Sequence, residues 1–301
     1  MRVAAIDCGT NSIRLLIADV SGGSLTDVAR RMEIVRLGEG VDSTGRLAPE
    51  AIERTRQALL GYAAEIAELG VDRVRMCATS ASRDASNAED FRSMVRSVLG
   101  VDPEVITGEE EARLSFTGAV HGLNAEPPYL VVDIGGGSTE FVVGFEKVDH
   151  AVSVDIGCVR MTERHLRGDP PSPAEVAAAE QDITRAVDGA LRKVSGHGTM
   201  TLIGLAGSVT TVAALALHLP KYDSGRIHHA RIAYDDVATV TADLLGATVA
   251  DRRDLAVMHP GRADVIAAGA LILRIIMQRA GKASVIASEH DILDGIAFSL
   301  A

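Results

Sequence analysis

The feature that most constrains this chain is a short motif that occurs twice, 126 residues apart and without a gap. Residues 7–14, DCGTNSIR, align with residues 133–140, DIGGGSTE, so that the Asp, the first Gly and the Ser coincide. Apolar stretches typical of β-strands flank both copies, which predicts that each copy is the turn of a β-hairpin. A repeat in one register, with each copy near the start of a domain, predicts two similar domains.

The boundary between these domains is marked by residues 126–128, because the tandem prolines Pro127 and Pro128 end a helix and stiffen the connection. We therefore predict an N-terminal domain over residues 1–124 and a C-terminal domain over residues 125–301. In open α/β sheets ligands bind in clefts at the strand ends, so both turns are expected to face an interdomain cleft.

Apolar periodicity and turn residues fill in the rest of an α/β pattern. Helices are expected at 49–70, 88–99, 109–120, 173–194 and 209–217, with further strands at 73–79, 105–106 and 201–205. A polar loop is expected at 80–87 and a turn at 206–208. The predicted fold class is α/β, with two domains that each carry a mixed sheet flanked by helices.

Charge and aromatic content exclude several classes of partner. The formal net charge is −11, from 30 basic and 41 acidic residues, and aromatic residues make up 3% with no Trp. Without a basic region or a stacking platform, we expect no nucleic-acid partner. The longest apolar run, residues 265–273, is less than half of the roughly 20 residues that span a membrane, so we expect no membrane partner and a cytoplasmic protein.

Three cysteines, Cys8, Cys77 and Cys158, form no C-x-x-C pair. Their odd number and spacing predict neither a disulfide framework nor a zinc site. Cys8 lies inside the first turn beside a carboxylate, not a cation, so we do not expect a reactive thiolate there.

The two turns suggest phosphate chemistry. Consecutive glycines expose backbone N–H groups and allow close approach of a ligand, and the second turn has Gly135, Gly136 and Gly137 before the hydroxyl of Ser138. Carboxylates beside a bound phosphate would repel it unless a cation such as Mg²⁺ lay between them. The alternative for either hairpin alone is a tight turn whose Asp side chain caps the local backbone.

Four linked segments resemble a known family: 7–14, 78–87 (ATSASRDASN), 108–113 (GEEEAR) and 132–140 (VDIGGGSTE). They are similar, in this order, to motifs of the exopolyphosphatase and guanosine pentaphosphate phosphohydrolase family, a branch of the actin-like superfamily with ribonuclease H-like domains. The resemblance runs through residues 1–145 and continues more loosely through 202–215 and 260–273.

The resemblance implies release of the terminal phosphate from inorganic polyphosphate, or of the 5′ terminal phosphate from guanosine pentaphosphate, with Mg²⁺ or Mn²⁺. It also implies a homodimer. The catalytic base of the family corresponds to Glu111, which would accept a proton from the attacking water. From the residues alone, Glu109, Glu110 and Glu111 are acids favourably placed at a helix N-terminus, an interpretation that we keep for Glu109 and Glu110.

The remaining site residues fall into two sets. The carboxylates of Asp7, Asp133 and Glu140 are the predicted metal ligands, and the last two match the metal-binding acids of the family. The predicted phosphate contacts are Asn11, Ser12, Arg14, Arg83, Gly135, Gly136, Gly137, Ser138, Gly207 and Ser208. An arginine fork suits phosphate oxygens, although Arg83 in a polar loop could equally be a solvated surface charge.

Two other functions stay open from the sequence: a kinase of the same fold, and a non-catalytic nucleotide or phosphate sensor, which would not need Glu111. The chain also departs from the family, because Ala206 replaces a glycine and Asp294 lies where an Arg-Glu-Gly segment is common, with no arginine before it. His228 and His229 are predicted to be structural, since neighbours on a strand point to opposite faces.

Overall fold

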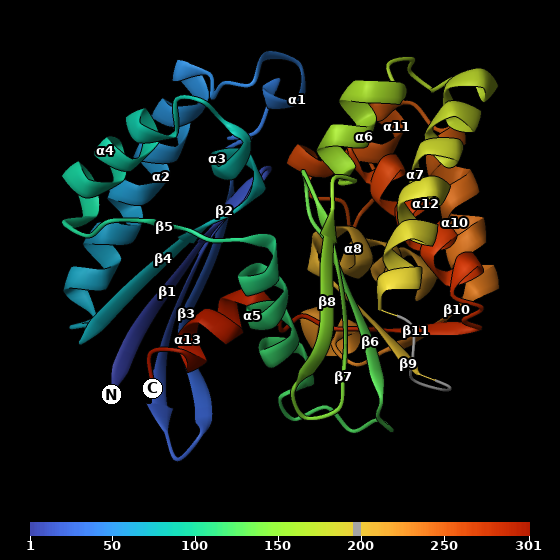
Figure 1. Cartoon of the computed structure of the whole chain (residues 1–301). Helices are drawn as coiled ribbons and strands as arrows, with labels where there is room; N and C mark the ends of the chain where they lie inside the picture. Colours follow the sequence, from blue (N-terminus) through green and yellow to red (C-terminus); the bar gives the residue numbers. More distant parts are fainter. Residues whose placement is uncertain (195–199) are drawn as a thin grey trace. The chain divides into compact units, whose positions relative to one another are not determined.

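The computed structural model describes residues 1–194 and 200–301, which form two compact units (Figure 1). Unit 1 comprises Met1–Gly118 together with Ile292–Ala301, and unit 2 comprises Ala119–Asp291. The division lies six residues before the predicted one, and the last ten residues differ from the prediction because they return to unit 1. They do so because helix α13 (Ile292–Phe298) buries Ile292, Leu293 and Ile296 against the sheet of unit 1.

Unit 1 is built on a five-stranded mixed sheet in the order β3-β2-β1-β4-β5. Its strands are β1 (Arg2–Cys8), β2 (Ser12–Ser21), β3 (Ser24–Ile34), β4 (Arg73–Ala78) and β5 (Glu104–Val105). The first three strands pair antiparallel, and β1, β4 and β5 pair parallel. The first motif copy is therefore the turn of a β-hairpin, as predicted.

Helices cover both faces of this sheet. Strand β1 is accordingly buried on both of its faces. Its alternate side chains enter different cores: Ile6 packs in a cluster with Leu59 and Phe91, whereas Val3 packs in a cluster with Leu114. The helices are α1 (Val41–Thr44), α2 (Pro49–Glu68), α3 (Ser80–Asp84), α4 (Ala88–Leu99), α5 (Gly108–Val120) and α13. In Figure 1, α2 and α4 lie on one face, and α5 and α13 on the other.

Unit 2 repeats this plan with one more strand, in the order β10-β11-β9-β6-β7-β8. Its strands are β6 (Tyr129–Ile134), β7 (Thr139–Gly144), β8 (Val148–Val154), β9 (Thr201–Leu205), β10 (Arg231–Ala233) and β11 (Ser284–Ala287). Antiparallel β8-β7-β6 and parallel β6-β9-β11 match the strand pattern of unit 1. The predicted fold class, two mixed sheets flanked by helices, is confirmed.

The helices of unit 2 bury a large aliphatic core against its sheet. They are α6 (Cys158–His165), α7 (Pro173–Lys193), α8 (Ala206–Ala216), α9 (Ser224–Ile227), α10 (Tyr234–Gly246), α11 (Val249–Arg253), the 3₁₀ helix Pro260–Arg262 and α12 (Ile266–Arg279). The capping box of Ser172 and Glu175 starts α7. The apolar run at 265–273 is mostly the buried part of α12, and none of the described helices is long and apolar enough to cross a membrane.

Three local predictions were wrong. Residues 80–84 of the expected loop form α3, and residues 206–208 of the expected turn belong to α8. His228 and His229 follow α9 and are not on a strand; their ring centroids lie 3.7 Å apart in a stacked arrangement, and His229 has a φ of +64°. Tertiary contacts outweigh local propensity in such short polar segments.

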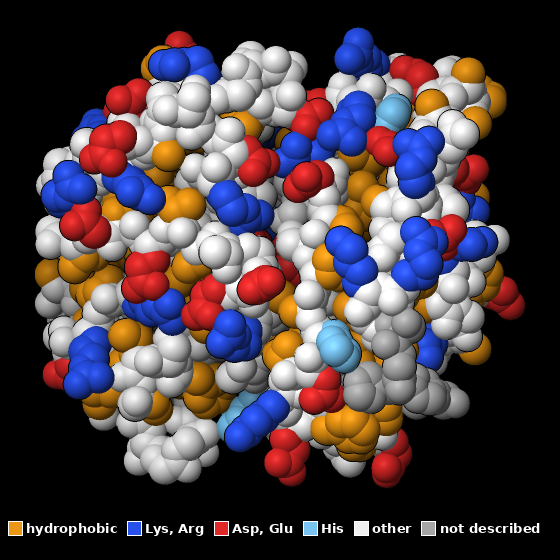
Figure 2. Space-filling view, viewed as in Figure 1, with side chains coloured by type: hydrophobic (Ala, Val, Ile, Leu, Met, Phe, Trp, Pro, Cys, Tyr) orange, Lys and Arg blue, Asp and Glu red, His pale blue; other side chains and the backbone are white. Residues whose placement is uncertain are grey.

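The cysteines lie in the interior, and charged side chains of both signs lie on the surface. All three cysteines are buried and form no disulfide, and burial raises the pKa of the Cys8 thiol and raises that of Cys77 to about 12. Figure 2 shows acidic and basic side chains interspersed over the visible face of the molecule.

An ion pair anchors α13 to unit 1. Arg30 on β3 donates to both carboxylate oxygens of the buried Asp294, at 2.6 and 3.3 Å. The pair therefore ties strand β3 to α13. Arg30 also donates to Asp27, which is about half exposed.

We predict that Asp294→Ala lowers the free energy of unfolding by about 2 kcal/mol, because it leaves the Arg30 guanidinium with one partner fewer and removes a buried bidentate pair. Asp27→Ala removes the exposed partner of the same arginine and is expected to cost about 0.5 kcal/mol or less. Urea unfolding of both variants measures the difference. Equal losses of the free energy of unfolding in the two variants would contradict the anchoring role of Asp294.

Candidate active site

Each motif copy forms the same turn at the end of a hairpin. In unit 1 the N–H of Gly9 donates to the carbonyl of Ser12 at 2.9 Å, and in unit 2 the N–H of Gly135 donates to the carbonyl of Ser138 at 3.0 Å. The hairpin register puts Asp7 opposite Arg14, and Asp133 opposite Glu140. Equivalent positions in the two units therefore carry different charge pairs.

In unit 1 this pair is an ion pair. Arg14 donates through Nη2 and Nε to one oxygen of the buried Asp7, at 2.6 and 3.0 Å. Asp7, a predicted metal ligand, and Arg14, a predicted phosphate contact, thus neutralise each other in the folded chain. Their contacts with metal and phosphate stay predictions.

In unit 2 the equivalent pair consists of two carboxylates. Asp133 and Glu140 are 7% and 1% exposed, and the hydroxyl of Ser153 donates to Glu140 Oε1 at 2.7 Å. Like charges directly opposite each other on a sheet are destabilising, and burial increases the cost. A cation between them would remove this repulsion.

The carboxylate pair fits a divalent cation such as Mg²⁺. This ion is usually bound by one or two carboxylates together with waters and substrate phosphates. Within residues 1–194 and 200–301 no group of three or more His, Cys, Asp or Glu could hold a metal by itself, so a metal at Asp133 and Glu140 would depend on oxygens from water and substrate.

The turn beside these carboxylates offers hydrogen-bond donors to an anion. We call Gly135–Ser138 the phosphate loop. In the described part of the chain, the backbone N–H groups of Gly136, Gly137 and Ser138 have no hydrogen-bond acceptor. Three neighbouring N–H groups without acceptors form the kind of concavity that binds phosphate oxygens.

The first turn also presents an unsatisfied donor. The Asn11 side chain is buried, and its Nδ2 has no hydrogen-bond partner among the described residues. Thr10, which was not among the predicted site residues, shares a buried hydrogen bond of 2.8 Å with Ser80 at the start of α3. A buried amide nitrogen without an acceptor is costly, which favours a ligand oxygen as the partner of Asn11; Ser12 is at the same turn.

Glu111 lies in the first turn of α5, where its own N–H donates to the carbonyl of Thr107 at 2.9 Å. Its residue surface is 8% exposed. Arg83 of α3 reaches it: Nη1 lies 3.2 Å from Glu111 Oε2 and 3.0 Å from the carbonyl oxygen of Ile106. Arg83 is thus not simply a solvated charge, since its guanidinium orients the predicted base.

Gly207 and Ser208 lie in the first turn of α8. A Cβ on Gly207 would lie 1.8 Å from Nη1 of Arg262, so the guanidinium packs directly over the glycine. Sequence reasoning missed Arg262, because it lies 55 residues away on a 3₁₀ helix. The Ser208 hydroxyl packs against Gly269 of α12, and Ala206 adopts a φ of +69°, the left-handed region that the glycine expected there would occupy without strain.

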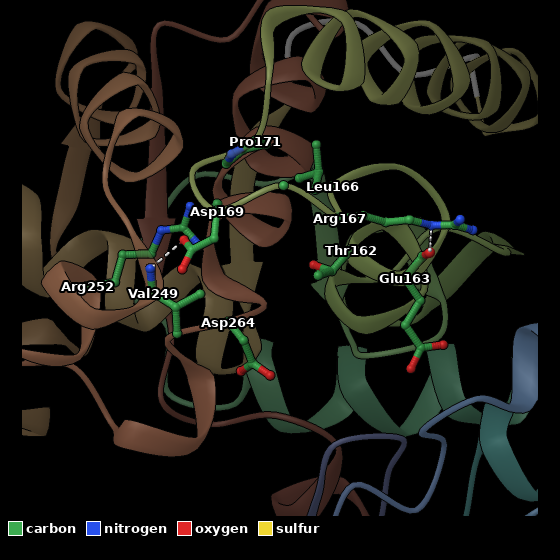
Figure 3. A pocket seen from close by; sticks show the side chains of 11 residues that line it. Thr162, Glu163, Leu166, Arg167, Asp169, Pro171, Val249, Arg252 and Asp264 are labelled. Carbon is green, nitrogen blue, oxygen red and sulfur yellow. Dashed lines mark hydrogen bonds between the residues drawn. The ribbon is translucent and has the colours of Figure 1, made fainter.

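A separate pocket of about 360 Å³ lies within unit 2 (Figure 3). It contains none of the predicted site residues. Three carboxylates and two arginines line it: Glu163, Asp169, Asp264, Arg167 and Arg252. Since acids outnumber bases there, the pocket is a poorer phosphate site than the phosphate loop.

Comparisons with known proteins identify relatives of this chain. A protein 52% identical to the whole chain, which covers 98% of that relative, is "Exopolyphosphatase 2" of Mycobacterium tuberculosis. Among solved structures, an exopolyphosphatase-like protein superposes with a TM-score of 0.94 at 42% identity over 100% of this chain and 97% of that one. The PPX-GPPA enzyme of Aquifex aeolicus superposes with a TM-score of 0.83 at 36% identity over 99% of both chains.

These likenesses confirm the two similar α/β units that the repeated hairpins predict and the fold that the family resemblance implies. The family model of the Ppx/GppA phosphatases matches residues 16–301, which contain three of the four quoted segments in full. The chain is a member of the Ppx/GppA phosphatase family.

Proposed function

We propose that this protein is a metal-dependent exopolyphosphatase, which releases the terminal phosphate from inorganic polyphosphate. The observation that carries the proposal is the buried pair of facing carboxylates, Asp133 and Glu140. They lie beside the phosphate loop, in which three of the four N–H groups, those of residues 136–138, lack acceptors in the described chain. This combination suits a cation and a phosphate together. The relative at 52% identity that is called an exopolyphosphatase supports this substrate class.

In the proposed reaction, water attacks the terminal phosphorus. A P–O bond forms to the water oxygen, and the phosphoanhydride bond to the next phosphate breaks, with the electron pair passing to the shortened chain. Glu111 accepts the water proton. The phosphate loop orients the terminal group through its N–H groups.

Other residues support this arrangement. Arg83 holds Glu111 through the 3.2 Å contact between Nη1 and Oε2, and Asn11 offers its buried amide to a substrate oxygen. Asp133 and Glu140 would hold the cation, either Mg²⁺ or Mn²⁺. When bound there, it would offset negative charge on the phosphoryl oxygens as a Lewis acid.

Phosphate release from short polyphosphate, long polyphosphate, guanosine pentaphosphate and ATP, with Mg²⁺, Mn²⁺ or a chelator, tests the proposal. We expect metal-dependent release from polyphosphate at a higher kcat/KM than from the two nucleotides. The acidic protein, with a net charge of −11, offers little non-specific attraction for long polyanions. We therefore expect kcat/KM for short polyphosphate to be at least as high as for long polyphosphate.

Each alternative has its own result in this assay. Faster release from guanosine pentaphosphate would replace the proposed substrate with the nucleotide. Phosphate transfer from ATP to an added small acceptor, without free phosphate, would indicate a kinase, and nucleotide binding without turnover would indicate a sensor. The homodimer and the cytoplasmic location stay predictions, which light scattering and cell fractionation test.

A further inference from the structure

The start of α6 donates hydrogen bonds to the carbonyl side of the phosphate loop. Three consecutive loop carbonyls accept hydrogen bonds of 2.7–3.1 Å from the first turn of this helix. The contacts are Cys158 N to Gly135 O at 2.9 Å, Val159 N and Arg160 N to Gly136 O at 2.9 and 3.1 Å, and Arg160 Nε to Gly137 O at 2.7 Å.

These contacts determine which way the loop amides point. In a trans peptide the C=O and the following N–H point in opposite directions. With the carbonyls of Gly135, Gly136 and Gly137 directed at α6, the N–H groups of the three following residues are directed away from it. They are the same N–H groups that lack acceptors in the described chain.

We infer that the first turn of α6 is a positioning element, which holds the phosphate loop with its amides aligned toward a phosphate. The inference rests on the proposed function, because it concerns the same loop. A helix N-terminus normally offers its own N–H groups to anions. Here those of Cys158, Val159 and Arg160 are bonded to the loop carbonyls, and the positive end of the α6 dipole lies directly behind the loop.

Gly157, the N-cap of α6, permits this close approach. A Cβ at this position would lie 2.3 Å from the carbonyl oxygen of Gly136 and 2.6 Å from the nitrogen of Gly137. Both are backbone atoms, so the loop itself would have to move. A further bond, from Thr139 Oγ1 to the carbonyl of Ile156 at 2.6 Å, holds the segment before the glycine against β7.

In unit 1, the carbonyls of the equivalent turn are also held by hydrogen bonds from a later segment. The segment after β3 caps the carbonyls of the first turn: Gly38 N donates to Thr10 O at 2.9 Å, and Val35 N and Arg36 N donate to Asn11 O at 3.1 and 2.9 Å. A Cβ on Gly38 would lie 2.3 Å from Thr10 Cγ2. In both units, therefore, the segment that follows the third strand supports the turn from its carbonyl side.

The matched pair Cys158→Pro and Cys158→Ala isolates one of these hydrogen bonds. Both variants lose the thiol, but only proline loses the N–H that donates to Gly135. Proline is otherwise well tolerated at the first position of a helix, and the extended Gly157, with φ −149° and ψ 164°, suits a following proline. Thermal unfolding midpoints of the two variants check that both are folded.

The readouts are the Kd of inorganic phosphate for the folded protein and, separately, kcat and KM on polyphosphate. Relative to Cys158→Ala, we expect Cys158→Pro to raise the Kd about 5- to 10-fold and to lower kcat by more than tenfold, because aligned donors stabilise the transition state more than the ground state. A merely structural role would reduce the amount of folded protein and leave the Kd of the folded fraction unchanged.

Gly157→Ala, which moves the loop itself, is expected to weaken phosphate binding by more than tenfold. If this variant does not fold, the comparison of Cys158→Pro with Cys158→Ala still tests whether α6 positions the phosphate loop. Equal Kd and kcat for the proline and alanine variants would overturn the inference. If the wild-type protein binds phosphate but releases none from polyphosphate, the proposed function is wrong. The inference about α6 is then still tested by the phosphate Kd values of Cys158→Pro and Cys158→Ala.

Discussion

Glu111→Gln is expected to lower kcat for phosphate release from polyphosphate by about 10²- to 10⁴-fold, the usual contribution of a general base. Glutamine keeps the shape of the side chain and can still accept the hydrogen bond that Arg83 Nη1 gives to Oε2. It cannot accept a proton from water at neutral pH. We therefore expect KM and the unfolding midpoint to change little, while the chemical step slows.

Glu109→Gln is the matched control for this variant. It removes the same charge from the same first turn of α5, at an exposed position. A general loss of negative charge near the helix N-terminus would affect both variants alike, whereas loss of the base affects only Glu111. Steady-state kinetics in which Glu111→Gln keeps at least a third of the wild-type kcat would exclude Glu111 as the base.

The second large effect concerns the facing carboxylates. Glu140→Gln is expected to lower activity at a fixed Mg²⁺ concentration by about 100-fold, since a bound cation contributes several kcal/mol to charge stabilisation. In the presence of a chelator the same variant is expected to unfold about 2 °C higher than wild type. The reason is that it removes one of two like charges that are buried opposite each other at Asp133 and Glu140.

Thermal unfolding with and without Mg²⁺ separates these effects from a general loss of structure. Mg²⁺ is expected to stabilise the wild type, because a ligand that binds only the folded state raises its stability, and to have a smaller effect on Glu140→Gln. Glu146→Gln, at an exposed position of the same domain, is the control and is expected to behave like wild type. A variant at position 140 with wild-type activity and an unchanged response to Mg²⁺ would contradict the cation site.

Much of the fold could be predicted because its signals are local. The two Asp-x-Gly turns with their flanking apolar strands predicted the hairpins that now place Asp7 opposite Arg14 and Asp133 opposite Glu140. The capping residues of α7 and the glycine after α2 similarly marked helix ends. Turns and helix caps depend on residues that are adjacent in the sequence, so the same residues favour them whatever the rest of the fold.

Short polar segments were harder, because their local preferences are weak. Residues 80–84 contain no strong helix signal, yet they form α3, which brings Arg83 to Glu111. His228 and His229 stack because the chain turns between α9 and β10. In both cases contacts with distant segments select a conformation that the local sequence leaves open.

By itself, the sequence determined the repeated hairpins, the α/β class and the residue types available for phosphate and metal, because strand alternation and turn chemistry are properties of adjacent residues. The tertiary structure alone decided the return of α13 to unit 1 through Arg30 and Asp294, 264 residues apart, and the support of the phosphate loop by α6. These contacts depend on the path of the chain between the partners, and no local pattern of residues encodes that path.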